Sequence, residues 1–128
     1  KIIIHCSATK LSMDVSADRI DEWHKKRGWN GIGYHYYVRK NGEIEKGRMD
    51  DVIGAHCKGH NKSSIGVCYE GGLNECNEPE DTRTDLQKIA LSVLINVLRI
   101  QHPESTVHGH NEFSSKACPC FDAQEEYN

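Results

Sequence analysis

The sequence lacks several features that would assign it to large classes of protein. It has no basic excess, because 16 Lys and Arg residues stand against 19 Asp and Glu residues, for a net charge of −3. A nucleic-acid-binding surface needs a basic stripe and a high pI, so we expect no nucleic-acid partner. No apolar run approaches the roughly 20 residues that a membrane-spanning helix requires. No secretory signal is visible, in a chain that begins at Lys1 without Met.

Internal repeats, linkers, low-complexity segments and CxxC pairs are also absent, so nothing supports a zinc ribbon or a thioredoxin-type site. The six cysteines have spacings that match no small secreted scaffold. We expect Cys6 and Cys68, in predicted strands, to be buried free thiols, whereas Cys57 and Cys76 lie in predicted loops and are candidates for a disulfide. The 128 residues should form one domain, residues 1–128, and we expect a monomer.

What the sequence does contain is an alternation of strand and helix patterns. Lys1–His5 and Ser64–Tyr69 are uninterrupted apolar runs that predict buried strands, and Thr106–Gly109 predicts a short one. Gly33–Lys40 alternates aromatic and β-branched residues, and Asn41-Gly42 after it favours a two-residue type I′ hairpin turn. These patterns predict an α/β or α+β domain with a central mixed β-sheet and helices packed on its faces.

Two longer helices and a final helical turn complete the predicted elements. Ser16 is a candidate N-cap for a helix over Ala17–Arg27. A second helix should follow a cap at Thr82 or Thr84, and Phe121–Tyr127 predicts the final turn. The apolar positions that predict the second helix recur three and four residues apart, and they are Leu86, Ile89, Ala90, Val93, Leu94, Val97 and Leu98.

Side chains that bind metals lie near both ends of the chain. His5 ends the first predicted strand, and strand ends are where ligands usually bind in such sheets. Near the other end, His108 and His110 fall on one face of a strand, and Cys118 competes with Cys120. Spacing alone does not choose within either pair. Two imidazoles and one thiolate suit Zn²⁺, and three protein ligands leave one position open, which is typical of a catalytic site.

Other residues near these positions suit hydrolysis. Lys116 lies two residues before the first candidate thiolate, where its charge could stabilise an oxyanion. Tyr34 and His35 lie in the aromatic strand, and the Tyr34 hydroxyl could orient a water molecule or relay a proton. The long segment Asp50–Ser63 is rich in Gly, His, Asn and Lys, and a loop of that length is often functional.

A series of short motifs, in order along nearly the whole chain, adds to these separate signals. The motifs are His5–Lys10, Trp23–Lys25, Gly28–Trp29, Gly33–Tyr36, Asn41–Gly42, Gly47–Arg48, Gly54–His56, Asn61, Ser64–Cys68, Gly71–Gly72, His110–Glu112, Lys116–Pro119 and Phe121–Asp122. In these motifs the chain resembles the type-2 N-acetylmuramoyl-L-alanine amidases. That family includes the phage lysozymes of amidase type and the animal peptidoglycan recognition proteins, and the likeness is strongest to the short phage enzymes.

The resemblance implies specific roles. It places the Zn²⁺ ligands at His5, His110 and Cys118, and the catalytic side chains at Tyr34 and Lys116. It implies hydrolysis of the amide that joins N-acetylmuramic acid to L-alanine in peptidoglycan. It also implies action on the cell wall, after release by a phage or secretion. The alternatives are a peptidoglycan-binding module without catalysis and a protein-binding regulator on the same fold.

The predicted substrate contacts follow from a groove hypothesis. We expect the stem peptide to lie along a groove walled by the Asp50–Ser63 loop. His35, Arg48, His56 and Asn61 are then the candidate substrate-binding residues.

Overall fold

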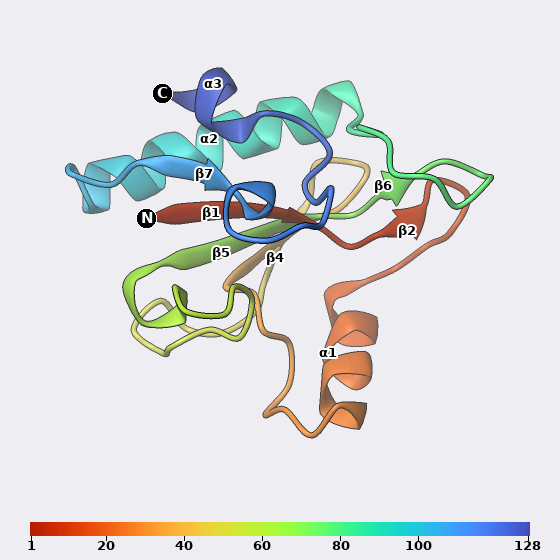
Figure 1. Cartoon of the computed structure of the whole chain (residues 1–128), viewed down its shortest axis with the longest axis horizontal. Coiled ribbons are helices and arrows are strands. Elements are labelled where there is room, and N and C mark those ends of the chain that lie inside the picture. Colours follow the sequence, from red (N-terminus) through yellow and green to blue (C-terminus); the bar gives the residue numbers. More distant parts are fainter.

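The computed structural model describes all residues 1–128 and has a five-stranded mixed β-sheet at its centre (Figure 1). Its strands are β1 (Ile2–Cys6), β3 (Tyr36–Val38), β4 (Ile44–Lys46), β5 (Ile65–Tyr69) and β7 (Val107–Gly109), in the spatial order β4-β3-β5-β1-β7. All neighbouring pairs are parallel except β3 and β4. Two further short strands, β2 (Thr9–Lys10) and β6 (Gly72–Leu73), pair in parallel beside this sheet. The predicted mixed sheet is confirmed.

The helices cover the two faces of the sheet. Helix α1 (Ala17–Lys26) lies on one face, and α2 (Asp85–Gln101) and α3 (Ala123–Tyr127) lie on the other (Figure 1). Short 3₁₀ turns occupy Asn61–Ser63 (η1) and His110–Glu112 (η2). None of the helices has both the length and the apolar character that crossing a bilayer requires.

Strand β1 lies between β5 and β7 and is buried on both sides, which explains its uninterrupted apolar run. Side chains alternate along it, so Ile2, Ile4 and Cys6 pack in the core beneath α2. His5 pairs with Cys68 of β5, and Cys68 packs in the cluster that contains residues of α1. His5 therefore points to the α1 face, where its imidazole can take part in a site.

The β3–β4 hairpin differs from its prediction. Arg39 N donates to Glu43 O at 2.8 Å, so three residues rather than two connect the paired positions. Gly42 N donates to Arg39 O, and Gly42 has a φ of +86° while Asn41 does not adopt a positive φ. A type I′ turn needs positive φ at both central residues, so that prediction is wrong. The loop is a type I turn followed by a left-handed glycine, the usual three-residue alternative.

Helix α2 is capped by Thr84, one of the two predicted caps, whose hydroxyl accepts from Gln87 N while the Gln87 side chain accepts from Thr84 N. Its buried face differs from the prediction. The side chains turned to the sheet are Gln87, Ala90, Leu91, Leu94, Ile95 and Leu98, whereas Leu86, Ile89, Val93 and Val97 are exposed. The helix carries apolar residues on two adjacent faces, and periodicity alone could not tell which of them meets the sheet.

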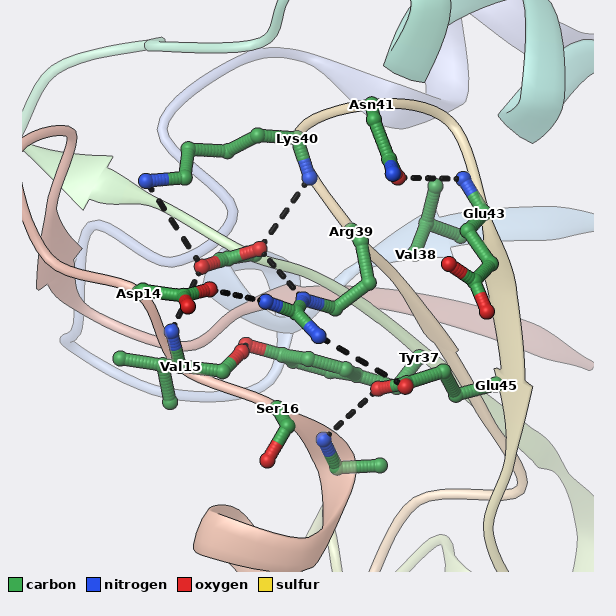
Figure 2. A network of polar contacts seen from close by, with 12 residues as sticks. Asp14, Val15, Ser16, Tyr37, Val38, Arg39, Lys40, Asn41, Glu43 and Glu45 are labelled. Atoms are coloured by element: carbon green, nitrogen blue, oxygen red, sulfur yellow. Dashed lines mark hydrogen bonds and ion pairs between the residues drawn. The ribbon is translucent and has the colours of Figure 1, made fainter.

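A buried carboxylate ties the chain before α1 to the hairpin (Figure 2). Glu70, at the end of β5, is 1% exposed and accepts from Val15 N and Arg39 Nε, both at 2.8 Å, and from Lys40 N at 3.1 Å. Arg39 also pairs with Asp14. A buried charge is tolerated only when it is paired, and Glu70 is paired with Arg39. Because Val15 lies just before α1 and donates to the same carboxylate, the cluster fixes where the chain enters α1.

The cysteines are all free. Cys6 and Cys68 are buried, as predicted. Cys57 is also buried, at 2% exposure, and does not pair with the exposed Cys76, so that candidate disulfide is not formed.

Candidate metal centre

Three potential ligands from distant parts of the sequence meet at the carboxyl end of β1. His5 is the fourth residue of that strand, His110 opens the 3₁₀ turn after β7, and Cys118 lies in the loop before α3. Since β1 and β7 are parallel neighbours, their carboxyl ends bring the two histidines to one edge. The loop that follows returns Cys118 to the same place.

The donor atoms of these three residues all lie within 4.8 Å of one another. The Sγ atom of Cys118 is 3.8 Å from His5 Nδ1, and the rings of His5 and His110 have centroids 4.6 Å apart. The two alternatives that spacing left open point elsewhere. His108 pairs with Glu112 at 2.9 Å, and Cys120 donates to the Gly72 carbonyl at 3.4 Å.

The protonation states of the three side chains suit metal binding. Burial lowers the pKa of His5 well below its usual range, and it also lowers the pKa of His110. The pKa of Cys118 is lowered, chiefly by a hydrogen bond from the Cys6 thiol, and Cys6 N also donates to its sulfur at 3.2 Å. Metal ions bind the neutral imidazole and the thiolate, so all three are shifted towards the forms that bind.

On its Nε2 side, His5 begins a hydrogen-bonded chain that runs through His56, which also lines the cavity, to Ser64. His5 Nε2 is 2.9 Å from His56 Nδ1, and His56 Nε2 is 3.2 Å from the hydroxyl of Ser64, which donates to the His60 carbonyl at 2.7 Å. With the proton of His5 on Nε2 and that of His56 on its own Nε2, every group in the chain is satisfied. This arrangement leaves the His5 Nδ1 lone pair free, on the side of Cys118.

Two glycines provide the space for the His56 ring. A Cβ atom added at Gly66 would lie 2.6 Å from the ring, and one added at Gly54 would lie 2.7 Å from it. Any side chain at either position would displace the imidazole. The two glycines therefore help to position His5 through the His56 ring, although neither lines the cavity.

A cavity of about 630 Å³ opens over the three ligands. Tyr34 and Lys116 line it together with them, and the Tyr34 ring is centred 5.1 Å from that of His5. Burial raises the pKa of Tyr34 well above its usual range, so its hydroxyl keeps its proton. Lys116 is exposed and also lowers the pKa of both histidine ligands. The cavity thus combines a phenol donor with an ammonium group beside the ligand cluster.

The far wall of the cavity comes from α1 and the turn after it. The lining residues there are Ile20, Trp23, His24, Arg27 and Trp29. His24 Nδ1 accepts from Gly33 N at 2.9 Å, and burial lowers the pKa of its ring to about 4. The guanidinium of Arg27 lies 5.5 Å from the Trp29 ring centre. Because α1 carries this wall, the Glu70 cluster that positions α1 also shapes the cavity.

The four predicted substrate contacts lie in different places. His56 and Asn61 line the cavity, although Asn61 Oδ1 also accepts from the backbone of His56 and Cys57 at 2.9 and 2.8 Å. His35 is completely buried, with one ring nitrogen accepting from Gly66 N and the other 2.8 Å from the Val52 carbonyl. Arg48 donates to the carbonyls of Ile32 and Ile53 and does not line the cavity. The structure does not bring His35 and Arg48 to the site.

Comparison with known proteins identifies the family of this chain. Residues 1–121 match the family described as N-acetylmuramoyl-L-alanine amidase. The chain belongs to this amidase family. An endolysin of Enterobacteria phage K11 is 42% identical to it over 124 residues, covering 97% of this chain and 82% of the relative. Among solved structures, the amidase LysC from Clostridium intestinale URNW superimposes with a TM-score of 0.84 at 32% identity, covering 98% of this chain and 78% of LysC.

Another similar structure within the same fold is a point mutant of Drosophila PGRP-LB in complex with tracheal cytotoxin. It has a TM-score of 0.77 at 25% identity, and the match covers 98% of this amidase-family chain and 77% of the PGRP-LB chain. The predicted family and fold are therefore confirmed.

Sequence reasoning missed one contact within the site. His56, a predicted substrate contact, lines the cavity, and its ring is also hydrogen-bonded to the candidate ligand His5, 51 positions away. No local pattern signals a contact between residues so far apart. The motifs contained His5, His56 and the two glycines, but their order along the chain does not indicate that they meet.

Proposed function

We propose that this protein is a peptidoglycan hydrolase that cleaves the amide between N-acetylmuramic acid and L-alanine, with Zn²⁺ held by His5, His110 and Cys118. The observation that carries the proposal is the cluster of three donor atoms within 4.8 Å at the floor of a cavity that Tyr34 and Lys116 also line. Membership of the amidase family supports the reaction, and the endolysin relatives support action on the cell wall.

The donor set fits zinc. Two imidazoles and a thiolate are ligands that Zn²⁺ accepts, and a set of three is the usual number at its catalytic sites. When bound, Zn²⁺ supplies Lewis-acid polarisation and makes water a stronger acid near neutral pH. The His56–Ser64 chain would hold His5 in the tautomer that binds.

The remaining chemistry falls to two side chains. The Lys116 ammonium group would donate to the carbonyl oxygen of the scissile amide, where negative charge develops. The Tyr34 hydroxyl, which keeps its proton, would donate to an oxygen of the tetrahedral species or pass a proton towards the leaving nitrogen. Both groups already line the cavity before substrate arrives. Such preorganisation is what electrostatic catalysis requires.

The substrate would extend from the ligand cluster between two walls. Asn61 lies on the side of the Asp50–Ser63 loop, and Trp23 and Trp29 lie on the side of α1. The rings suit the apolar faces of a sugar or peptide, and polar groups across from them suit its amides. His35 and Arg48 would act only by holding the walls in place.

The test compares wild type with Cys118→Ser on purified peptidoglycan. Turbidity should fall with wild type, stop on addition of a zinc chelator and resume on addition of Zn²⁺. Elemental analysis should find about one zinc per wild-type chain and much less in the variant. If wild type binds peptidoglycan and zinc yet releases no new L-alanine amino terminus, the protein is a binding module and the hydrolase proposal fails.

A further inference from the structure

Unlike the two histidine ligands, Cys118 comes from a segment without helix or strand, residues 114–121. The only backbone-to-backbone hydrogen bond that this segment makes, from Cys120 N to Ala117 O at 2.7 Å, lies within the segment itself. Its main chain therefore has no bond of this kind to the sheet. The place of the thiolate depends instead on bonds that involve side chains.

The shortest bond between this segment and the rest of the protein comes from Tyr69, whose hydroxyl donates to the Pro119 carbonyl at 2.7 Å. Both residues are buried, and a buried carbonyl almost always has a donor. The Asn111 amide reaches the carbonyls of Ala117 and Phe121 only at 3.5 and 3.4 Å. Because Pro119 directly follows the candidate ligand, the Tyr69 bond limits how far the thiolate can move.

Tyr69 belongs to the same part of the sheet as His5. It is the last residue of β5 and lies beside Cys6 in the parallel register with β1. Cys6 follows His5 and donates its backbone N–H to Cys118 Sγ at 3.2 Å. Two adjacent strand ends therefore carry both His5 and the groups that hold the thiolate. Side chains held by strands keep a more precise geometry than side chains held by loops alone.

The ring of Tyr69 has a separate role from its hydroxyl. The side chain is completely buried in the cluster beneath α2, and its ring centre lies 6.3 Å from that of Phe121. The Arg83 guanidinium lies 3.4 Å from the same Phe121 ring. A phenylalanine in place of Tyr69 would keep these ring contacts and lose only the bond to Pro119. The hydroxyl can therefore be tested without disturbing the core.

We propose that Tyr69 is a positioning residue for Cys118. Its hydroxyl holds the Pro119 carbonyl, and thereby places the thiolate where it meets the imidazoles of His5 and His110. Tyr69 does not line the cavity, so it acts on the ligand and not on the substrate. The inference rests on the proposed function in one respect, that Cys118 is a zinc ligand.

The experiment compares Tyr69→Phe with Tyr37→Phe. Tyr37 is a matched control, because it is equally buried and donates to a carbonyl, that of Val15, at 2.8 Å on the α1 side. Both variants lose one buried hydroxyl, so both should fold and melt at similarly lowered temperatures. Competition with a chromophoric chelator should show zinc binding about tenfold weaker in Tyr69→Phe, equivalent to about 1.4 kcal/mol. Tyr37→Phe should stay within about twofold of wild type.

A second measurement follows the sulfur in the metal-free protein. The Cys6 amide donates to Cys118 Sγ, so its hydrogen exchange reports whether the thiolate is in place. In Tyr69→Phe this amide should exchange at least about fivefold faster, while the amide of Ile4 in the same strand and both amides in Tyr37→Phe should not change.

The outcomes separate this inference from the proposed function. Equal zinc affinities for Tyr69→Phe and Tyr37→Phe, or an unchanged Cys6 amide in Tyr69→Phe, would each overturn the role of Tyr69. A wild-type protein that binds no zinc would overturn the proposed zinc site instead. The exchange rate of the Cys6 amide would then decide by itself whether Tyr69 holds the segment.

Discussion

The contact between His5 and His56 allows a sharp prediction about metal binding. His56→Ala removes the acceptor 2.9 Å from His5 Nε2, in a place where His5 is only 1% exposed. The buried N–H group loses its partner, which typically costs about 1–3 kcal/mol. Part of that cost lowers the stability of the metal-free protein. The rest weakens zinc binding, because without the acceptor the proton of His5 can move to Nδ1 and occupy the lone pair that faces Cys118.

We therefore expect His56→Ala to bind Zn²⁺ about 10–100-fold more weakly, the usual effect of losing the hydrogen-bond partner of a ligand histidine. Two conservative variants distinguish the hydrogen bond of His56 to His5 from its hydrogen bond to Ser64. In His56→Asn the amide oxygen can take the place of Nδ1 and should restore most of the affinity. In His56→Gln the side chain is longer, reaches towards Ser64 instead, and should restore less.

The assay is competition with a chromophoric zinc chelator at neutral pH, alongside thermal melting of each metal-free variant. Co²⁺ substitution gives a second reading, because the absorption bands of a thiolate-bound cobalt report the ligand geometry directly. The reasoning is refuted if His56→Ala binds zinc within twofold of wild type while its cobalt spectrum is unchanged. Equal losses for Asn and Gln would show that the ring matters only for packing.

Other predictions concern catalysis, stability and pH. Lys116→Ala should lower the rate of amide hydrolysis about 10²–10³-fold while zinc content stays at the wild-type level, and a near-normal rate would remove Lys116 from the reaction. Glu70→Ala should lower the free energy of unfolding by about 3–5 kcal/mol, because it leaves Arg39 Nε and two backbone N–H groups without their acceptor. Its control in urea denaturation is Asp14→Ala, which removes a carboxylate with 87% side-chain exposure and should cost less than about 1 kcal/mol. Burial lowers the pKa of His24 to about 4 and that of His56 to about 3, against 6.5 in the unfolded chain. Between pH 6.5 and 4 the unfolded state thus binds more protons, so the melting temperature of the metal-free protein should fall as the pH is lowered through this window, and a flat profile would contradict the burial argument.

Much of the fold could be predicted from the sequence because local patterns decided it. The apolar runs of β1 and β5 are explained by burial on both faces, and the caps of α1 and α2 lie at Ser16 and Thr84. The hairpin turn could not be settled in the same way. Asn41-Gly42 suits a type I′ turn locally, but the register of the strands places only Gly42 in the left-handed region. The register depends on how β3 and β4 pack in the rest of the sheet, and a two-residue pattern cannot predict that.

The candidate site was predictable to a different extent. The residues alone suggested His5 and a histidine–cysteine segment, and resemblance to the amidases selected His110 and Cys118 from it. The surroundings of these ligands were harder to foresee. His35 and Arg48 lie in conspicuous motifs, yet their polar atoms are used by backbone groups inside the protein. A polar residue in a motif can either contact the substrate or support the protein interior. Only its hydrogen-bond partners in the folded protein distinguish these two roles.

The meeting of His5 with Cys118 spans 113 positions. During synthesis the ligand cluster can therefore form only after both β7, which leads to His110, and the loop that carries Cys118 have been made. Closing so large a loop is slow and entropically costly, so the ligand cluster should be a late event in folding. A nascent or truncated polypeptide that ends before Cys118 would contain all the strands of the sheet but would lack the thiolate of the ligand cluster. If the proposed zinc site carries the activity, that activity depends on this last segment being present and folded back against β1.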